Sequence, residues 1–170
     1  MKTKTKGVIY RHQRPEDIIE LAKLLKEVSN ESGRISARNL DTMHAMSQFF
    51  KIQADAEKDR RISIVAEYNG KIVGHAMIKK MSGRLHKVGE VGIIVKKEFR
   101  NRGIGTSLMK TLFKEAKKIG IKIALLQVIA DNESAIHVYK KLKFKEMGRL
   151  PKCFDFGNRM KDVIYMYRTL

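Results

Sequence analysis

The sequence predicts one mixed α/β domain, and three observations support this. Apolar residues that alternate with polar ones mark several short strands, and apolar residues at helical spacing mark the segments between them. A largely apolar, β-branched run over 121–129 indicates a buried parallel strand. At 170 residues, 43% of them hydrophobic, the chain is long enough for one well-packed core but short for two. We therefore expect residues 1–170 to form a single domain.

The N-terminal part of the chain carries signals for a strand followed by helices. A short strand is expected over 8–10. A helix is expected from Pro15, because a proline at the first helical position removes an N–H that has no partner there anyway. Apolar residues at helical spacing extend this helix to Val28. The spacing also predicts a second helix over 40–58.

A hairpin and a strand–helix–strand unit follow. Residues 62–68 and 71–78 read as two strands around Asn69-Gly70, a dipeptide typical of a two-residue hairpin turn. The order of elements places a parallel strand–helix–strand unit at the centre of the domain. The remaining expected elements are a strand over 88–95, a helix from Ile104 to near Gly120, the strand 121–129, a helix capped by Asn132, a strand from Phe144 and a strand over 163–167.

The net charge of +18 predicts attraction to polyanions, which include nucleic acid, ribosomes and phosphorylated cofactors. A generally lysine-rich, well-solvated surface explains the same net charge. The chain has no long basic tail, and aromatic residues make up only 7% of it, without interleaving with the basic ones. These features favour the solvated surface, and they leave weak polyanion or ribosome association as an open interpretation.

Composition also indicates in which cellular compartment the protein is expected. The single cysteine, Cys153, cannot form an intramolecular disulfide and is typical of a reducing environment. No apolar stretch follows the basic residues of 1–6, and the longest apolar stretch, 123–130, is far shorter than a membrane span. We expect a soluble, cytoplasmic protein with no membrane partner. The five histidines and Cys153 show no metal-ligand spacing, so we expect no metal.

The most informative segment is the turn between the strand over 88–95 and the helix that follows. It reads Arg100-Asn101-Arg102-Gly103-Ile104-Gly105, which fits R-x-x-G-x-G. Glycine allows the backbone to approach a ligand closely, and the first N–H groups of a helix have no partner within it. Such a turn is suited to a pyrophosphate. Neither the dinucleotide pattern G-x-G-x-x-G nor the nucleotide P-loop is completed.

The stretch from Glu90 to Met147 resembles the core of the GNAT superfamily of N-acetyltransferases, which use acetyl-coenzyme A. The turn matches the phosphate motif of that family, [RQ]-x-x-G-x-[GA], and residues 132–144 match its downstream motif. Residues 162–166 resemble the family's last strand. One position departs from the pattern, because Lys143 stands where the family usually has glycine before Phe144.

The resemblance implies a mixed, mostly antiparallel central sheet with flanking helices, and acetyl-CoA as co-substrate. It implies that the amides of the glycine turn receive the pyrophosphate. The pantetheine arm would run like an extra strand beside residues 93–95, with an N–H near Ile93 or Ile94 polarising the thioester carbonyl. Asn132 would reach the arm, or serve simply as a helix cap. The implied cofactor-binding positions are Ile93, Ile94, Val95, Arg100, Asn101, Arg102, Gly103, Ile104, Gly105, Thr106, Asn132 and Tyr139.

Two residues are implied for proton transfer. Tyr139 matches the family's usual general acid, because a phenol is protonated at neutral pH and can donate to a departing thiolate. Its spacing also fits a core aromatic residue. Glu90 is our candidate base, acting directly or through water, although a charged residue near a strand start is often merely solvated. His75 and His137 are weaker candidates.

The resemblance implies transfer of acetyl to a primary amine by direct attack in a ternary complex. Residues 31–59 would shape the acceptor site, where Asp55, Glu57 and Asp59 could attract a cationic amine. The same three residues also fit the solvated end of a helix, and this account is favoured. The amine itself is left open, among a protein N-terminus, a lysine and small molecules. A homodimer also stays open. The alternatives are a GNAT module that binds acyl-CoA without turnover and a basic nucleic-acid or ribosome-associated protein.

Overall fold

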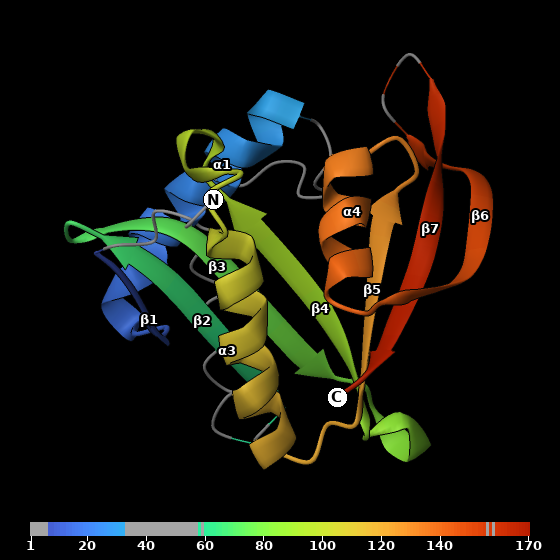
Figure 1. Cartoon of the computed structure of the whole chain (residues 1–170), viewed down its shortest axis with the longest axis horizontal. Helices are drawn as coiled ribbons and strands as arrows, with labels where there is room; N and C mark the ends of the chain where they lie inside the picture. The colour runs from blue at the N-terminus through green and yellow to red at the C-terminus, as the bar shows by residue number, and fades with distance from the viewer. Residues whose placement is uncertain (1–6, 33–57, 59, 156, 158) are drawn as a thin grey trace.

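The structure is a computed structural model that describes residues 7–32, 58, 60–155, 157 and 159–170. The helix expected over 40–58, and nearly all of the proposed acceptor segment 31–59, lie outside the described residues. Strands and helices alternate much as the sequence predicts (Figure 1). The strands are β1 (Val8–His12), β2 (Arg61–Tyr68), β3 (Lys71–Lys80), β4 (Val88–Val95), β5 (Ile123–Ile129), β6 (Lys145–Asp155) and β7 (Met160–Thr169). The helices are α1 (Ile18–Ser32), α3 (Ile104–Lys118) and α4 (Glu133–Lys141).

The strands form one sheet in the order β1-β2-β3-β4-β5-β7-β6. Every neighbouring pair is antiparallel except β4 and β5, which are parallel. The connection between these two strands is α3, as the strand–helix–strand reading predicted, because parallel neighbours need a long crossover. The expected mixed, mostly antiparallel sheet with one parallel pair is thus confirmed.

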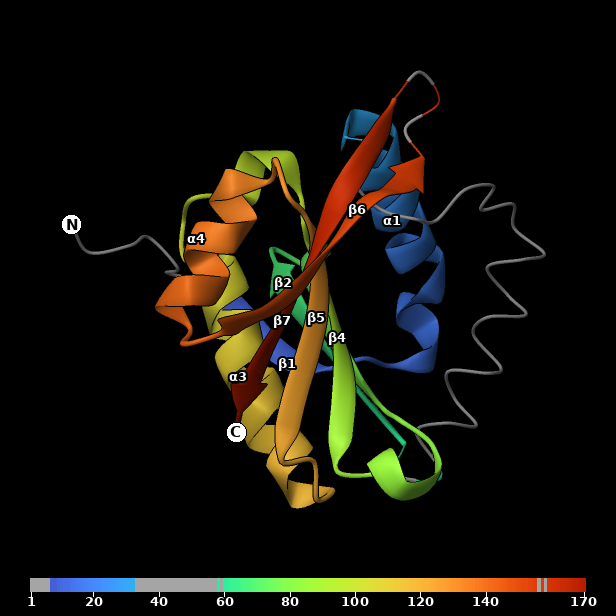
Figure 2. The ribbon, with the colours of Figure 1, turned by 90° about the vertical axis from the view of Figure 1, so that its right-hand side faces the viewer.

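Helices cover both faces of the sheet (Figure 2). α3 and α4 lie on one face and α1 lies on the other. The larger core cluster packs α3, through Leu108 and Leu112, against the sheet. A smaller cluster, which includes Leu24 of α1 and Ile94 of β4, packs α1 on the opposite face. The central strands are therefore buried on both sides, which explains their near-continuous apolar sequence.

Local signals in the sequence set several boundaries. The hairpin between β2 and β3 turns at Asn69 and Gly70, with φ values of 50° and 73°, as a two-residue turn with both central residues left-handed requires. Pro15 opens a 3₁₀ turn that leads directly into α1. β6 begins one residue after the expected Phe144 and runs to Asp155, longer than the short strand expected. Its edge position leaves it exposed along nearly its whole length.

None of the helices in the described ranges combines the length and the hydropathy that crossing a bilayer requires.

Candidate functional site

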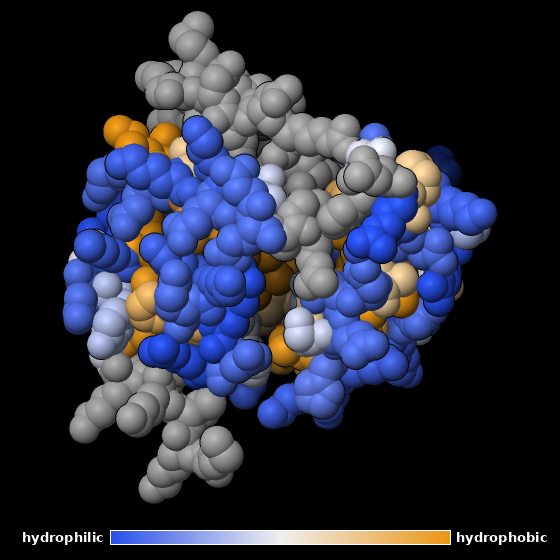
Figure 3. Space-filling model, turned by 90° about the horizontal axis from the view of Figure 1, so that it is seen from above, coloured by the Kyte–Doolittle hydropathy of each residue, from blue (hydrophilic) through white to orange (hydrophobic). Residues whose placement is uncertain are grey.

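A fork between β4 and β5 forms the centre of the site. The two strands pair only from Val88 with Ile123 to Glu90 with Leu125, yet β4 continues to Val95 and β5 to Ile129. Beyond Glu90 the strands diverge (Figure 1). Seen from above, hydrophobic atoms are visible in a hollow between the part of the surface that carries α3 and the part that carries α4 (Figure 3). One edge of β4 is therefore left without a strand partner among the described residues.

Strand alternation decides which main-chain groups open into this fork. On the other edge of β4, the N–H of Lys96 donates to Val73 O at 2.9 Å, so even-numbered residues direct their N–H and C=O groups toward β3. Odd-numbered residues, among them Val91 and Ile93, then direct theirs into the fork. Of the two amides considered for the thioester carbonyl, that of Ile93 faces the fork and that of Ile94 faces β3. The side chain of Ile94 is buried against α1.

The glycine turn lies at the end of β4, where the fork is open. Gly103 precedes α3 with a left-handed φ of 82°, and Asn101 is also left-handed, at 58°. The first turn of α3 closes when Ser107 N–H donates to Gly103 O at 3.0 Å. The amides from 103 to 106 come before that bond, so they have no carbonyl partner within the helix. Together with the helix dipole, they form a site suited to a phosphate.

Gly105 keeps this turn close to β4. A Cβ at this position would lie 3.6 Å from Ile93 Cδ1 and 3.7 Å from Val95 Cγ2, which is ordinary contact. Alanine therefore fits here without displacing a neighbour, in agreement with the [GA] position of the motif. The start of α3 and the open edge of β4 are thus held side by side.

A family model for the acetyltransferase (GNAT) family matches residues 24–144, well over half of the chain. The chain belongs to the GNAT acetyltransferase family. This confirms the resemblance found in the sequence.

Relatives of this GNAT chain include an N-alpha-acetyltransferase of Sulfurisphaera tokodaii, 34% identical over 55% of this chain. An L-amino acid N-acetyltransferase of Escherichia coli is 32% identical over 62% of it. The match covers 62% of the Sulfurisphaera protein and 67% of the E. coli protein. An uncharacterized N-acetyltransferase of Methanocaldococcus jannaschii is 38% identical over 53% of this chain, and that match covers only 42% of the M. jannaschii protein.

Solved structures agree over almost the whole chain. A GNAT-family acetyltransferase from Streptococcus pneumoniae, 27% identical, aligns with 96% of this chain and 99% of its own, with a TM-score of 0.86. A putative acetyltransferase from Salmonella typhimurium, solved with acetyl-CoA, has the same TM-score at 20% identity and covers 97% and 95%. The second likeness supports the GNAT fold alone.

Capping interactions at both ends define α4 of this GNAT domain, which lies beside the fork. At its start, Asn132 Oδ1 accepts the N–H of Ala135 at 3.4 Å, which is the cap predicted from the sequence. At its end, the N–H of Lys143 donates to Lys140 O and that of Phe144 donates to Tyr139 O, a Schellman motif. The rings of Phe144 and Tyr139 also pack, with centroids 5.8 Å apart.

Tyr139 is partly buried, on the α3 side of the sheet. Burial raises the pKa of its phenol to about 12, so the hydroxyl keeps its proton at neutral pH. The sequence left two readings for this residue, a core aromatic and a proton donor. The ring packs against the larger core cluster, as the first reading expects. The raised pKa is compatible with the second, and the proton-donor role stays a prediction.

Glu90 occupies the last parallel pair, at the base of the fork. Alternation places its side chain on the α1 face, opposite to Tyr139. The carboxylate is exposed, and Gln127 Nε2 of β5 donates to its Oε1 at 3.3 Å. Gln127 is not among the site residues predicted from the sequence. A signal was present, because Gln127 is the single polar interruption of an apolar run.

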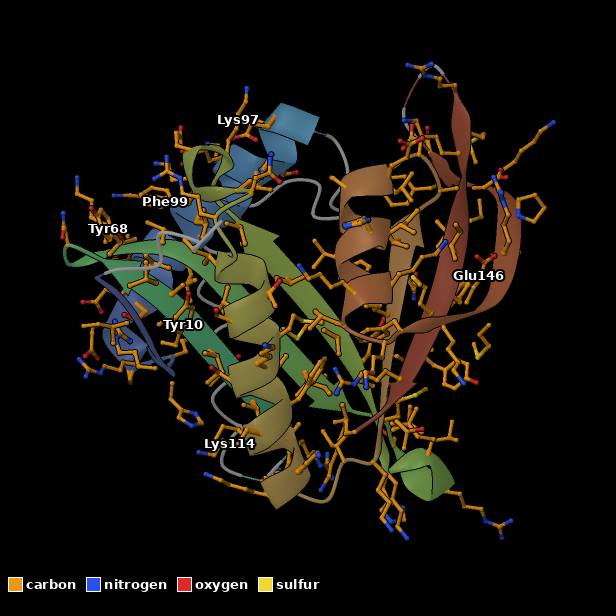
Figure 4. All side chains as sticks on the ribbon, in the orientation of Figure 1. Tyr10, Tyr68, Lys97, Phe99, Lys114 and Glu146 are labelled. Carbon is orange, nitrogen blue, oxygen red and sulfur yellow. The ribbon has the colours of Figure 1, made fainter. Side chains whose placement is uncertain are left out.

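The two arginines of the turn have different environments. Arg100 donates from Nε to Val95 O at 2.9 Å and forms an ion pair with Glu31 of α1, also at 2.9 Å. Its guanidinium therefore anchors the end of β4 to α1. The exposed Arg102 stacks on the ring of Phe99 at 5.4 Å, and Phe99 packs edge-on against Tyr68 (Figure 4).

The histidines named from the sequence do not meet in the fork. His137 is exposed on α4, and His75 is buried on β3. Burial, with Arg61 nearby, lowers the pKa of His75 to about 3, so this ring stays neutral. Across the described residues, no three His, Cys, Asp or Glu side chains cluster in a way that could hold a metal ion.

Proposed function

We propose that this protein transfers an acetyl group from acetyl-CoA to a primary amine, which attacks directly in a ternary complex. The observation that carries the proposal is the fork, whose open β4 edge ends at a helix N-terminus. A single ligand that has a pyrophosphate at one end and an amide-bearing arm at the other suits both features. The names of the two relatives above, an N-alpha-acetyltransferase and an L-amino acid N-acetyltransferase, support an amine acceptor.

The residues present fit acetyl-CoA. The free amides of 103–106 would hold the pyrophosphate, with Arg102 adding charge beside them. The main-chain groups of Val91 and Ile93 would pair with the amides of the pantetheine arm, as an added strand does. Asn132 would contact the arm while it caps α4. Acetyl-CoA supplies the acetyl group as a thioester, whose carbonyl carbon accepts an amine and whose sulfur departs as a thiolate.

Three groups then serve the chemistry. The N–H of Ile93 would donate to the carbonyl oxygen, where negative charge develops as the C–N bond forms. Glu90, directly or through a water, would accept the proton that the amine loses. Tyr139 would give its proton to the sulfur as the C–S bond breaks. Glu90 and Tyr139 are on opposite faces of the sheet, so the proton that the amine loses and the proton that the thiolate gains would be handled by separate groups.

Calorimetric titration with acetyl-CoA tests the cofactor site. Thr106 is the third residue of α3, where a glutamate is favourable to the helix. Thr106→Glu should keep or raise the thermal stability. It should also weaken acetyl-CoA binding by about 100-fold or more, because a like charge a few ångströms from a phosphate costs on the order of 3–4 kcal/mol. Thr106→Gln, of the same size but neutral, should bind nearly as well as the wild type.

Steady-state kinetics with a panel of amines tests the chemistry. Tyr139→Phe should lower kcat by about 100-fold or more and leave the KM for acetyl-CoA nearly unchanged. A folded wild type that binds acetyl-CoA but acetylates no amine would instead favour a binding module. A folded wild type that does not bind acetyl-CoA would refute the proposal.

A further inference from the structure

A basic groove of about 420 Å³ lies between α3 and α4, and the proposed acetyl transfer makes no use of it. Six of its eight lining residues are lysine or arginine. Lys114 lies on the C-terminal half of α3 (Figure 4). The residues that line this α3–α4 groove are Lys110, Phe113, Lys114, Lys117, Lys141, Leu142, Lys143 and Arg168.

The positive charge of the groove is not neutralised from within. Among the described residues, no acidic side chain lines the groove and none of its five lysines forms an ion pair. Glu115 of α3 is close in sequence but pairs with Lys118 at 2.8 Å and approaches His12 at 3.5 Å. Lysines spaced three and four residues apart on one helix face repel each other. The fold therefore keeps a cluster of unpaired charge that an external anion would stabilise.

Helix dipoles explain only part of this charge. A lysine in the last turn of a helix is favourable, which accounts for Lys117 and Lys141. The dipole effect falls off within one turn, so it does not account for Lys110 or Lys114. Lys143 is beyond the end of α4 and holds a left-handed φ of 65°, a position at which glycine is less strained. At this position the chain carries a cation at a cost in backbone energy.

Arg168 forms a fixed positive group in the groove. Its guanidinium stacks 4.9 Å above the ring of Phe113, and Nη1 donates to Leu142 O at 2.8 Å. These contacts tie β7 to α3 and to the C-terminal end of α4, and within the described part of the chain they hold the charge in place without an acidic partner. A charge fixed in this way loses little side-chain entropy when an anion binds.

The groove is separate from the glycine turn. With a rise of 1.5 Å per residue, Lys110, Lys114 and Lys117 lie about 9, 15 and 20 Å along α3 from Ile104. An anion held by the amides at the start of the helix would thus leave the groove free. The groove cations also extend over about 10 Å of helix, a length that suits a repeated anion better than a single phosphate.

We propose that the α3–α4 groove binds the phosphodiester backbone of a nucleic acid without reading its bases. Lysines act as point charges toward phosphate, whereas base recognition relies on planar, bidentate groups or on exposed aromatic rings. Here five of the six cations are lysines, and Phe113 is only 4% exposed, beneath Arg168. The net charge of +18 adds long-range attraction for the same polyanion.

Fluorescence anisotropy over a salt series tests the proposal, with a 20-base-pair RNA duplex and a DNA duplex of the same sequence as probes. The groove variant is Lys110→Gln/Lys114→Gln/Lys141→Gln. The matched control is Lys26→Gln/Lys71→Gln/Lys87→Gln, at exposed lysines elsewhere, which removes the same net charge. Glutamine keeps good helix propensity, and thermal melts verify that both variants fold.

The groove variant should reduce the slope of log K against log salt by about 3, and should weaken binding by about 100-fold or more at 0.1 M salt. The control should change the slope by about 1 at most. Binding of either duplex that depends on the groove lysines supports the proposal. The duplex that binds with the higher affinity shows whether the groove prefers RNA or DNA. Acetyl-CoA affinity should be the same in both variants.

Three results would overturn the inference. Equal losses in the two variants would assign the binding to the charge of the whole surface. A loss of acetyl-CoA affinity in the groove variant would make the groove part of the cofactor site. Polyglutamate of equal charge that binds as tightly as the duplexes would point to an acidic protein in place of a nucleic acid.

Discussion

Replacing Lys143 with glycine should stabilise the protein, although it removes a side chain and adds no contact. Lys143 follows α4 with a φ of 65°, and this conformation allows its N–H to reach Lys140 O at 2.9 Å. A left-handed conformation costs a residue with a side chain about 1–2 kcal/mol. Glycine removes that strain but gives the unfolded chain more freedom, worth about 0.5–1 kcal/mol. The expected net gain in the free energy of unfolding is about 0.5–1 kcal/mol.

Urea titration and thermal unfolding measure this gain. For a chain of this length, the melting temperature should rise by about 2 °C. Lys143→Ala is the control for charge, because it removes the ammonium group and keeps the left-handed backbone strain. Gly120→Ala is the reverse control at the matching position after α3, where φ is 81° and an added Cβ would meet nothing within 4 Å. The free energy of unfolding of Gly120→Ala should be lower than that of the wild type by about 1 kcal/mol. If Lys143→Ala gains as much as Lys143→Gly, relief of charge repulsion is the cause and the backbone argument is wrong.

Two further predictions concern pH. Burial raises the pKa of Tyr139 to about 12, so the unfolded chain loses this proton at a lower pH than the folded protein does. The free energy of unfolding of the wild type should therefore fall by on the order of 2 kcal/mol between about pH 10 and 12. Tyr139→Phe should lack that part of the loss in urea titrations at pH 9 and 11.5, and parallel curves for the two proteins would contradict the burial argument. Burial lowers the pKa of His75 to about 3, so stability should be full above pH 6.5 and decline as the pH falls toward 3. At pH 5, His75→Phe should retain about 2 kcal/mol more of its neutral-pH stability than the wild type, and an equal decline in both would show that His75 is protonated without cost.

Short-range signals predicted much of the fold. Asn69-Gly70 predicted the hairpin because few residues adopt two successive left-handed conformations. Gly120 predicted the end of α3 for the same kind of reason, and Asn132 predicted the cap of α4. Each of these signals depends on the backbone preferences of a few neighbouring residues, which the sequence states directly.

Contacts between distant segments were decided only by the tertiary structure. The expected strand 121–129 was correct, but its pairing with β4 stops at Glu90, and this termination opens the fork. The sequence placed Arg100 in the phosphate turn but gave no indication that its side chain reaches Glu31, 69 residues away in sequence. No local pattern encodes either result, because both depend on how packed elements are spaced.

The sequence by itself thus determined the strand–turn–helix motif, the family and the total charge of this protein. Only the tertiary structure decided where that charge gathers. Lys110, Lys143 and Arg168 lie far apart in the chain, and they meet because α3, α4 and β7 pack on the same part of the sheet. Periodicity reports which face of an element is buried, whereas the alignment of neighbouring elements follows from the packing of the whole core.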